Sequence, residues 1–150
     1  KSGSDIVQIF DSWAGLIPEK YLKDLCFNPT KKIVNFCKKK NIPVICFPKG
    51  LNKKYKSFVD HVKPNGISID YEIKPSWARA NLKNICIQGG LNPKYLLGNE
   101  KLLEQKVKEY LNIFSDVPYI FNLGHGLLPE TNPVILNKLI KKVKEFKNER

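Results

Sequence analysis

The chain has 150 residues, 42% of them hydrophobic, and a formal net charge of +12 at pH 7. A single domain of this length buries roughly two-thirds of its unfolded surface, and no apolar run approaches the roughly 20 residues of a membrane span, so we expect one globular domain and no membrane partner. Only Arg79 and Arg150 are arginines among the 26 basic residues. Since base-reading sites favour arginine, we expect no nucleic-acid partner. The positive electrostatic field of the chain would still attract a polyanionic small molecule.

Strand-like and helix-like patterns alternate along the chain in five units. An apolar run at 6–10 is followed by a helical pattern at 30–40, and a strand at 42–47 by a helix at 52–62. Strands at 66–70 and 84–88 precede helices at 75–82 and 100–114. The last unit pairs a strand at 119–123 with a helix at 132–146, which we expect Asn132 to cap and Pro133 to begin.

The five strands are rich in Val, Ile and Phe, which is typical of parallel strands covered on both faces. We therefore predict an α/β fold of about five βα units, which is an incomplete (β/α) barrel because a closed barrel needs eight. The chain also contains no methionine, so we expect it to be the distal part of a longer protein.

Polar residues follow these strands, at the positions that form the active-site face of a (β/α) barrel. They are Asp11, Ser12, Lys49, Asp70, Tyr71, Gln88, Asn122 and His125. His125 stands between two glycines after an apolar run, which predicts a presented side chain, although a satisfied turn histidine fits the same pattern. Residues 8–15 repeat this design, so Ser12 and His125 are expected to share one site.

The four cysteines Cys26, Cys37, Cys46 and Cys86 lie in apolar or helical settings, and no two form a C-x-x-C pair. We expect reduced cysteines acting as small hydrophobic residues, and neither disulfides nor a metal site. This usage favours the cytoplasm, and the first residues lead into a strand where an exported protein would carry a signal-peptide core.

Four motifs resemble, in order and spacing, the C-terminal motifs of the uroporphyrinogen decarboxylase family. They are 8–15 (QIFDSWAG), 68–71 (SIDY), 88–93 (QGGLNP) and 121–126 (FNLGHG). The resemblance implies that residues 1–150 form the C-terminal portion of a single TIM-barrel domain and supply its strands four to eight. It also implies a cofactor-free enzyme, a homodimer, that removes four acetate carboxylates from uroporphyrinogen III in haem biosynthesis.

By the same resemblance, Ser12 and His125 contact carboxylates of the tetrapyrrole substrate, and Phe10 lies beside its macrocycle. The chain departs from the family at Gly90 and Asn92, where asparagine and aspartate are usual, and at Tyr71, where tryptophan is usual. The family's paired arginines, pyrrole-binding aspartate and substrate-binding tyrosine belong to the first three units. The chain has no equivalent of them, so we expect no catalytic residue here and no activity from the chain alone.

Two alternatives remain at this point. One is a related barrel of the corrinoid methyltransferase type with a zinc-thiolate site, whose members tend to carry cysteine at the position of His125 and a His-x-Cys pair that this chain lacks. The other is a non-catalytic fragment or binding module.

Overall fold

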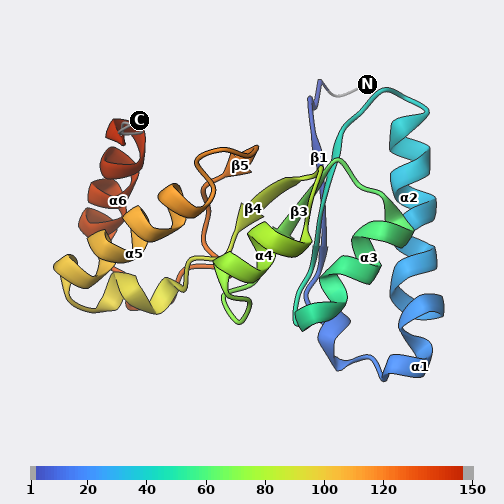
Figure 1. Cartoon of the computed structure of the whole chain (residues 1–150), viewed down its shortest axis with the longest axis horizontal. Coiled ribbons are helices and arrows are strands. Elements are labelled where there is room, and N and C mark those ends of the chain that lie inside the picture. The colour runs from blue at the N-terminus through green and yellow to red at the C-terminus, as the bar shows by residue number, and fades with distance from the viewer. Residues whose placement is uncertain (1–2, 147–150) are drawn as a thin grey trace.

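The structure, a computed structural model, describes residues 3–146. Five strands form one parallel sheet, namely β1 (Val7–Asp11), β2 (Val44–Pro48), β3 (Gly66–Ile69), β4 (Cys86–Gly89) and β5 (Tyr119–Ile120) (Figure 1). Their order in the sheet is their order in the chain, as expected for strand–helix–strand crossovers. The predicted α/β class with about five parallel βα units is confirmed, and the arrangement is consistent with part of a (β/α)8 barrel.

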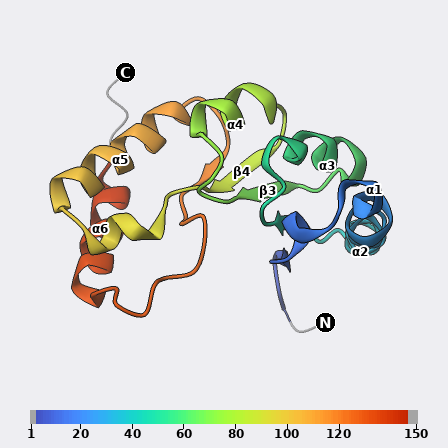
Figure 2. The same ribbon diagram turned by 90° about the horizontal axis from the view of Figure 1, so that it is seen from below.

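The helices lie outside an arc whose inner side carries the strands (Figure 2). They are α1 (Glu19–Leu22), α2 (Asn28–Lys38), α3 (Tyr55–Val62), α4 (Pro75–Asn81), α5 (Glu100–Ile113) and α6 (Pro133–Glu145). Asn132 caps α6, since its side-chain oxygen accepts a bond of 2.9 Å from the backbone N–H of Val134. The predicted cap and the proline in the first turn are therefore confirmed.

The two faces of the sheet differ in what covers them. Val44, Cys46 and Ile67 belong to the hydrophobic core that includes the helices, and each is almost fully buried. Ile45 and Phe47 alternate with these residues on β2 and lie outside that core cluster. They therefore point to the other, concave face of the sheet.

The first helical region begins earlier than the expected residue 30. α1, a π-helical turn at Lys23–Phe27 and α2 follow one another without a break. Pro29 explains both why the helix was expected to begin only at residue 30 and why a π turn is present. A proline inside a regular α-helix removes one hydrogen bond and clashes with the carbonyl four residues before it. The wider π turn, which ends at Phe27, accommodates that proline, so the helix continues through residues for which no helix was predicted.

The outer strands also differ from expectation. β5 has two residues in place of five, since its ladder with β4 covers only Tyr119 and Ile120, and Leu123 forms an isolated parallel bridge with Leu91. The prediction that the strands are covered on both faces is wrong for β1 and β5, since Phe10 on β1 is 66% exposed and Ile120 on β5 is 39% exposed. A short 3-10 helix at Pro93–Leu97 was not predicted.

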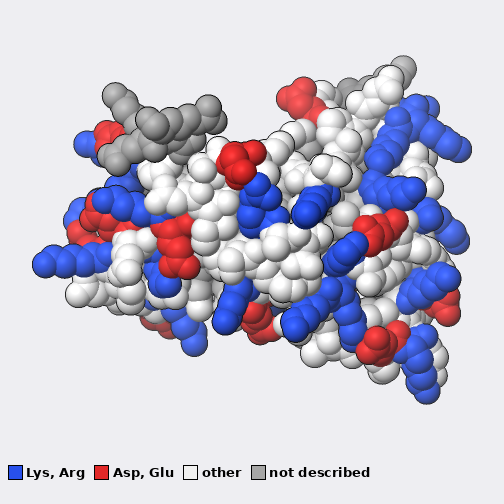
Figure 3. Space-filling view, in the orientation of Figure 1, with Lys and Arg blue, Asp and Glu red and all other residues white. Residues whose placement is uncertain are grey.

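Lysines spread over the visible surface among acidic residues (Figure 3). Lys32, Lys38, Lys101 and Lys141 are examples of helix lysines that are exposed, as the helical patterns predicted. Among residues 3–146, no helix combines the length and the apolar character that crossing a membrane would need.

Candidate functional site

The loops that follow the five strands meet at one edge of the sheet, the carboxyl edge, because all the strands run parallel. Ser12 directly follows β1, and His125 follows β5 after a short turn. Both side chains are exposed. The two predicted site residues therefore share the carboxyl edge, but they stand at its two ends with β2, β3 and β4 between them.

The loop that carries Ser12 is fastened to the loop after β2. The N–H of Lys49 donates to the carbonyl of Asp11 at 3.0 Å, and the N–H of Gly15 donates to the carbonyl of Lys49 at 2.8 Å. Gly15 and Gly50 lie so close that a Cβ on Gly15 would stand 2.6 Å from the carbonyl oxygen of Gly50. Glycine at position 15 is thus required for the contact between the two loops.

Asp70, the residue directly after β3, is buried, and its carboxylate accepts hydrogen bonds from three different residues. Its Oδ2 accepts hydrogen bonds from the N–H of Gly50 at 2.7 Å and the hydroxyl of Tyr55 at 2.8 Å, and its Oδ1 accepts from the N–H of Glu72 at 3.0 Å. Burial and the neighbouring Asp70 carboxylate raise the pKa of Tyr55 above its ordinary value. The sequence marked Asp70 as a polar residue at the site, but at 1% exposure it does not face the open side.

The loop that carries His125 rests on the loops after β3 and β4. The N–H of Gly124 donates to the carbonyl of Leu91 at 2.8 Å. A Cβ on Gly124 would stand 2.5 Å from the backbone nitrogen of Tyr71. The His125 side chain is exposed, as expected of a presented residue. The glycine before His125 therefore serves close packing, while His125 itself is presented.

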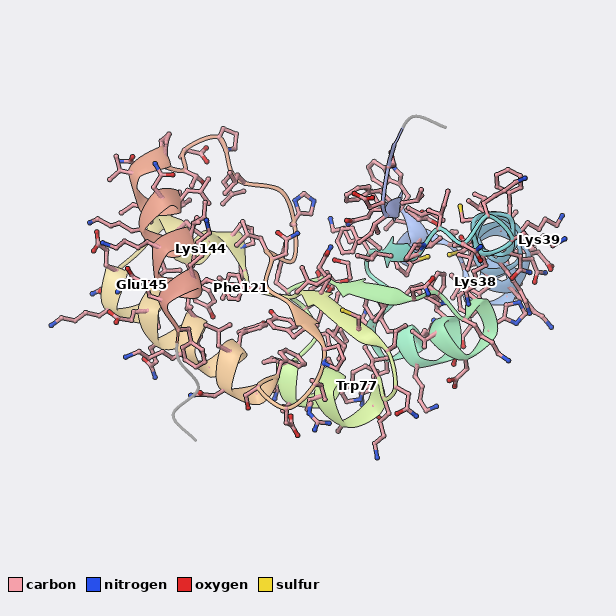
Figure 4. All side chains as sticks on the ribbon, turned by 90° about the horizontal axis from the view of Figure 1, so that it is seen from above. Lys38, Lys39, Trp77, Phe121, Lys144 and Glu145 are labelled. Atoms are coloured by element: carbon pink, nitrogen blue, oxygen red, sulfur yellow. The ribbon has the colours of Figure 1, made fainter. Side chains whose placement is uncertain are left out.

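An apolar hollow of about 480 Å³ opens beside His125, between its loop and α6. Phe121 and Lys144 line it (Figure 4), together with Leu136 and Ile140. A hollow of about 710 Å³ lies elsewhere, along Gly15, Gly50, Lys53 and Trp77, and does not include Ser12 or His125.

A row of side chains crosses the concave face just inside the carboxyl edge. Phe10 pairs in register with Phe47, and their rings meet edge to face with centroids 6.0 Å apart. Ser68 pairs with Gln88, and Gln88 with Ile120. Phe10 and Ile120 are thus the exposed ends of an inner row whose middle members are buried, and Phe10 is the more exposed of the two.

Gln88, which pairs with Ser68 in this row, is one of the polar strand-end residues that the sequence singled out. It is 4% exposed, and its Nε2 has no hydrogen-bond partner among the described residues. A buried amide without a partner is unusual, because it loses its hydration without compensation. Its place at the end of the predicted strand 84–88 marked Gln88 as a polar residue of the site edge, but gave no sign that its amide would lack a partner.

The cysteines agree with the expected small hydrophobic role. Cys26, Cys37 and Cys46 are buried free thiols, and Cys86 is half-buried. Burial raises the pKa of Cys26 and of Cys46 to about 12. In the part of the chain that the structure describes, no group of three or more His, Cys, Asp or Glu side chains could hold a metal ion.

Comparison with known proteins gives one consistent result. The profile of the family described as Uroporphyrinogen decarboxylase (URO-D) matches residues 1–146. Similar proteins are the uroporphyrinogen decarboxylases of Rickettsia bellii, with 40% identity over 97% of this chain and 44% of the relative, and of Orientia tsutsugamushi strain Boryong, with 40% over 97% and 43%. The uroporphyrinogen decarboxylase of Cereibacter sphaeroides ATCC 17025 is 34% identical over 96% of this chain and 43% of its own length. The chain thus spans less than half the length of these curated relatives.

Proposed function

Because the chain belongs to the uroporphyrinogen decarboxylase family, we propose that residues 1–150 are the C-terminal portion of an enzyme that converts uroporphyrinogen III to coproporphyrinogen III. The reaction removes carbon dioxide from four acetate side chains without a cofactor, as a carboxy-lyase of haem biosynthesis. The complete enzyme is a cytoplasmic homodimer with one TIM-barrel domain, of which this chain supplies strands four to eight.

The observation that carries the proposal is the position of Ser12 and His125 after the two outer strands at one carboxyl edge. In a closed eight-stranded barrel the fourth and the eighth strands stand opposite each other across the mouth. A tetrapyrrole carries its carboxylates around its perimeter, so two anchors on opposite sides would hold it across that mouth. The exposed ring of Phe10, backed by Phe47, offers an apolar surface to the macrocycle.

The chemistry limits what these residues do. Loss of carbon dioxide from an acetate leaves a carbanion, and protonation of the substrate's own pyrrole supplies the electron sink. The enzyme must then stabilise a cationic pyrrole beside a carboxylate. Ser12 and His125 donate hydrogen bonds to other carboxylates and orient the ring, and neither can replace an aspartate at the pyrrole. They are therefore binding residues, and the chain alone is inactive.

The test compares the 150-residue chain with a longer protein that contains it, measuring coproporphyrinogen formation from uroporphyrinogen. We expect activity only from the longer protein. Within it, His125→Ala should raise KM by about 10-fold or more and should lower kcat by a smaller factor. The reason is that a hydrogen bond to a charged partner contributes about 1.5 to 3 kcal/mol to binding. Ser12→Ala should also raise KM by about 10-fold, because its hydroxyl likewise donates to a charged carboxylate.

Ser57→Ala and His61→Gln on α3 are matched controls, since they change the same residue types away from the carboxyl-edge loops. A fall in kcat of about 100-fold at unchanged KM for His125→Ala would make His125 a general acid and refute the binding role. Coproporphyrinogen formation by the 150-residue chain would refute its dependence on the other units.

A further inference from the structure

We propose that Asp70 is a positioning residue that fixes the loop carrying Ser12 relative to the loop carrying His125. The inference rests on the proposed function of those two residues, and adds a third residue that acts through them. Asp70 stands after the central strand β3, between the two ends of the carboxyl edge. At 1% exposure it acts on substrate only through its neighbours.

On one side, Asp70 reaches the Ser12 loop in two steps. Its Oδ2 accepts the 2.7 Å bond from the N–H of Gly50, and this holds the loop after β2. In that loop the carbonyl of Lys49 accepts a 2.8 Å hydrogen bond from the N–H of Gly15, and the backbone of Gly50 packs directly against Gly15. Gly15 ends the short segment that begins with Ser12, so a shift of Gly50 moves the Ser12 segment with it.

On the other side, the backbone at Asp70 and Tyr71 supports the His125 loop. The nearest atoms to a Cβ built on Gly124 are the nitrogen of Tyr71 at 2.5 Å and the carbonyl carbon of Asp70 at 2.9 Å. The bond that the Asp70 Oδ1 accepts from the N–H of Glu72 at 3.0 Å holds that stretch of backbone in its turn. Displacing the turn would therefore displace Gly124 and the adjacent His125.

The carboxylate is suited to this role because it accepts from three donors on two oxygens. Tyr55 is the third donor, since its hydroxyl donates to Oδ2 and also accepts the N–H of Asp70 at 3.3 Å. An asparagine would keep the shape but replace one oxygen with an NH2 group that faces at least one N–H donor. Asp70→Asn thus breaks at least one link with little change in volume.

The experiment measures KM and kcat of the longer protein with Asp70→Asn, alone and combined with Ser12→Ala or His125→Ala. We expect Asp70→Asn to raise KM by about 100-fold, the product of losing both anchors, while kcat stays within about threefold. Each alanine substitution should raise KM by less than about twofold in the Asp70→Asn background, because the loop it changes is already displaced. Tyr55→Phe should give a smaller KM increase of the same kind, and serves if Asp70→Asn does not fold. Asp60→Asn is the matched control, since Asp60 is an exposed aspartate on α3 paired with Lys56 at 2.8 Å.

The proposal would be overturned if the increases in KM caused by Asp70→Asn and by the alanine substitutions simply multiply. It would also be overturned if Asp70→Asn lowers kcat and leaves KM unchanged. If the unsubstituted protein forms no coproporphyrinogen, the proposed function fails, and amide hydrogen exchange then decides the coupling. Asp70→Asn should accelerate exchange at both Gly15 and Gly124, whereas Asp60→Asn should change neither. Acceleration at only one glycine, or at neither, would show that Asp70 does not couple the two loops.

Discussion

Replacing Gly15 with alanine should separate the loops after β1 and β2. The new Cβ would stand 2.6 Å from the carbonyl oxygen of Gly50, whereas ordinary contact begins at 3.4 Å, so the backbones must part by about 0.8 Å. That shift lengthens the 2.8 Å bond from Gly15 to Lys49 beyond hydrogen-bonding distance. Overpacking costs about 1 to 3 kcal/mol and the lost bond about 0.5 to 1.5, so we expect a loss of about 2 to 4 kcal/mol in the free energy of unfolding.

Equilibrium denaturation followed by the fluorescence of Trp13 and Trp77 measures this loss, and a thermal scan should show a Tm lower by about 5 to 15 °C. Gly126→Ala is the matched control, because a Cβ there meets nothing within 4 Å and Gly126 shows no positive φ. It should change stability by less than about 1 kcal/mol. Equal stability of Gly15→Ala and Gly126→Ala would refute the reasoning from the close contact.

Two further predictions concern titratable groups that have no part in the proposed binding role. Burial and neighbouring lysines lower the pKa of His61 from 6.5, so the stability due to its neutral form is present above about pH 6.5 and lost as the pH falls towards the folded-state pKa. Between about pH 7.5 and 5.5, unfolding free energy should therefore fall less in His61→Gln than in the unsubstituted protein, and an equal fall would contradict the assignment. In the 150-residue chain at about pH 8, a thiol reagent should modify the half-buried Cys86 before Cys26 and Cys46, whose pKa of about 12 leaves roughly one part in 10⁴ as thiolate. Mass spectrometry of partly labelled protein measures the order, and early labelling of Cys26 would argue against its burial.

The units of the fold could be predicted because their signals are local. The helix expected at 52–62 is present as a 3-10 turn at Asn52–Lys54 followed by α3, and those expected at 75–82 and 100–114 end one residue early. In each case the spacing of apolar residues that predicts the helix is contained within the helical segment itself. The π turn before Pro29 was missed because its stability depends on packing of the whole helical region and not on a local pattern.

The candidate site could be predicted in part. The strand-end pattern located Ser12 and His125 at one carboxyl edge, since parallel strands make that edge common to all of them. The role of Asp70 could not be predicted, because its hydrogen-bond donors Gly50 and Tyr55 lie 20 and 15 residues away and contact it only in the folded chain. The close approach of Gly124 to Tyr71 likewise depends on a distant segment, so the sequence explained only the turn at that glycine.

Because the order of strands in the sheet equals their order in the chain, each strand bonds only to the strand that precedes or follows it. Such a sheet grows one unit at a time, in the way that repeat proteins do, and no strand waits for a segment from the far end of the chain. Opening can likewise proceed from the outside, beginning with the two-residue β5 and the partly exposed β1. The central strand β3, buried along its whole length, should therefore be the last to lose its amide protection.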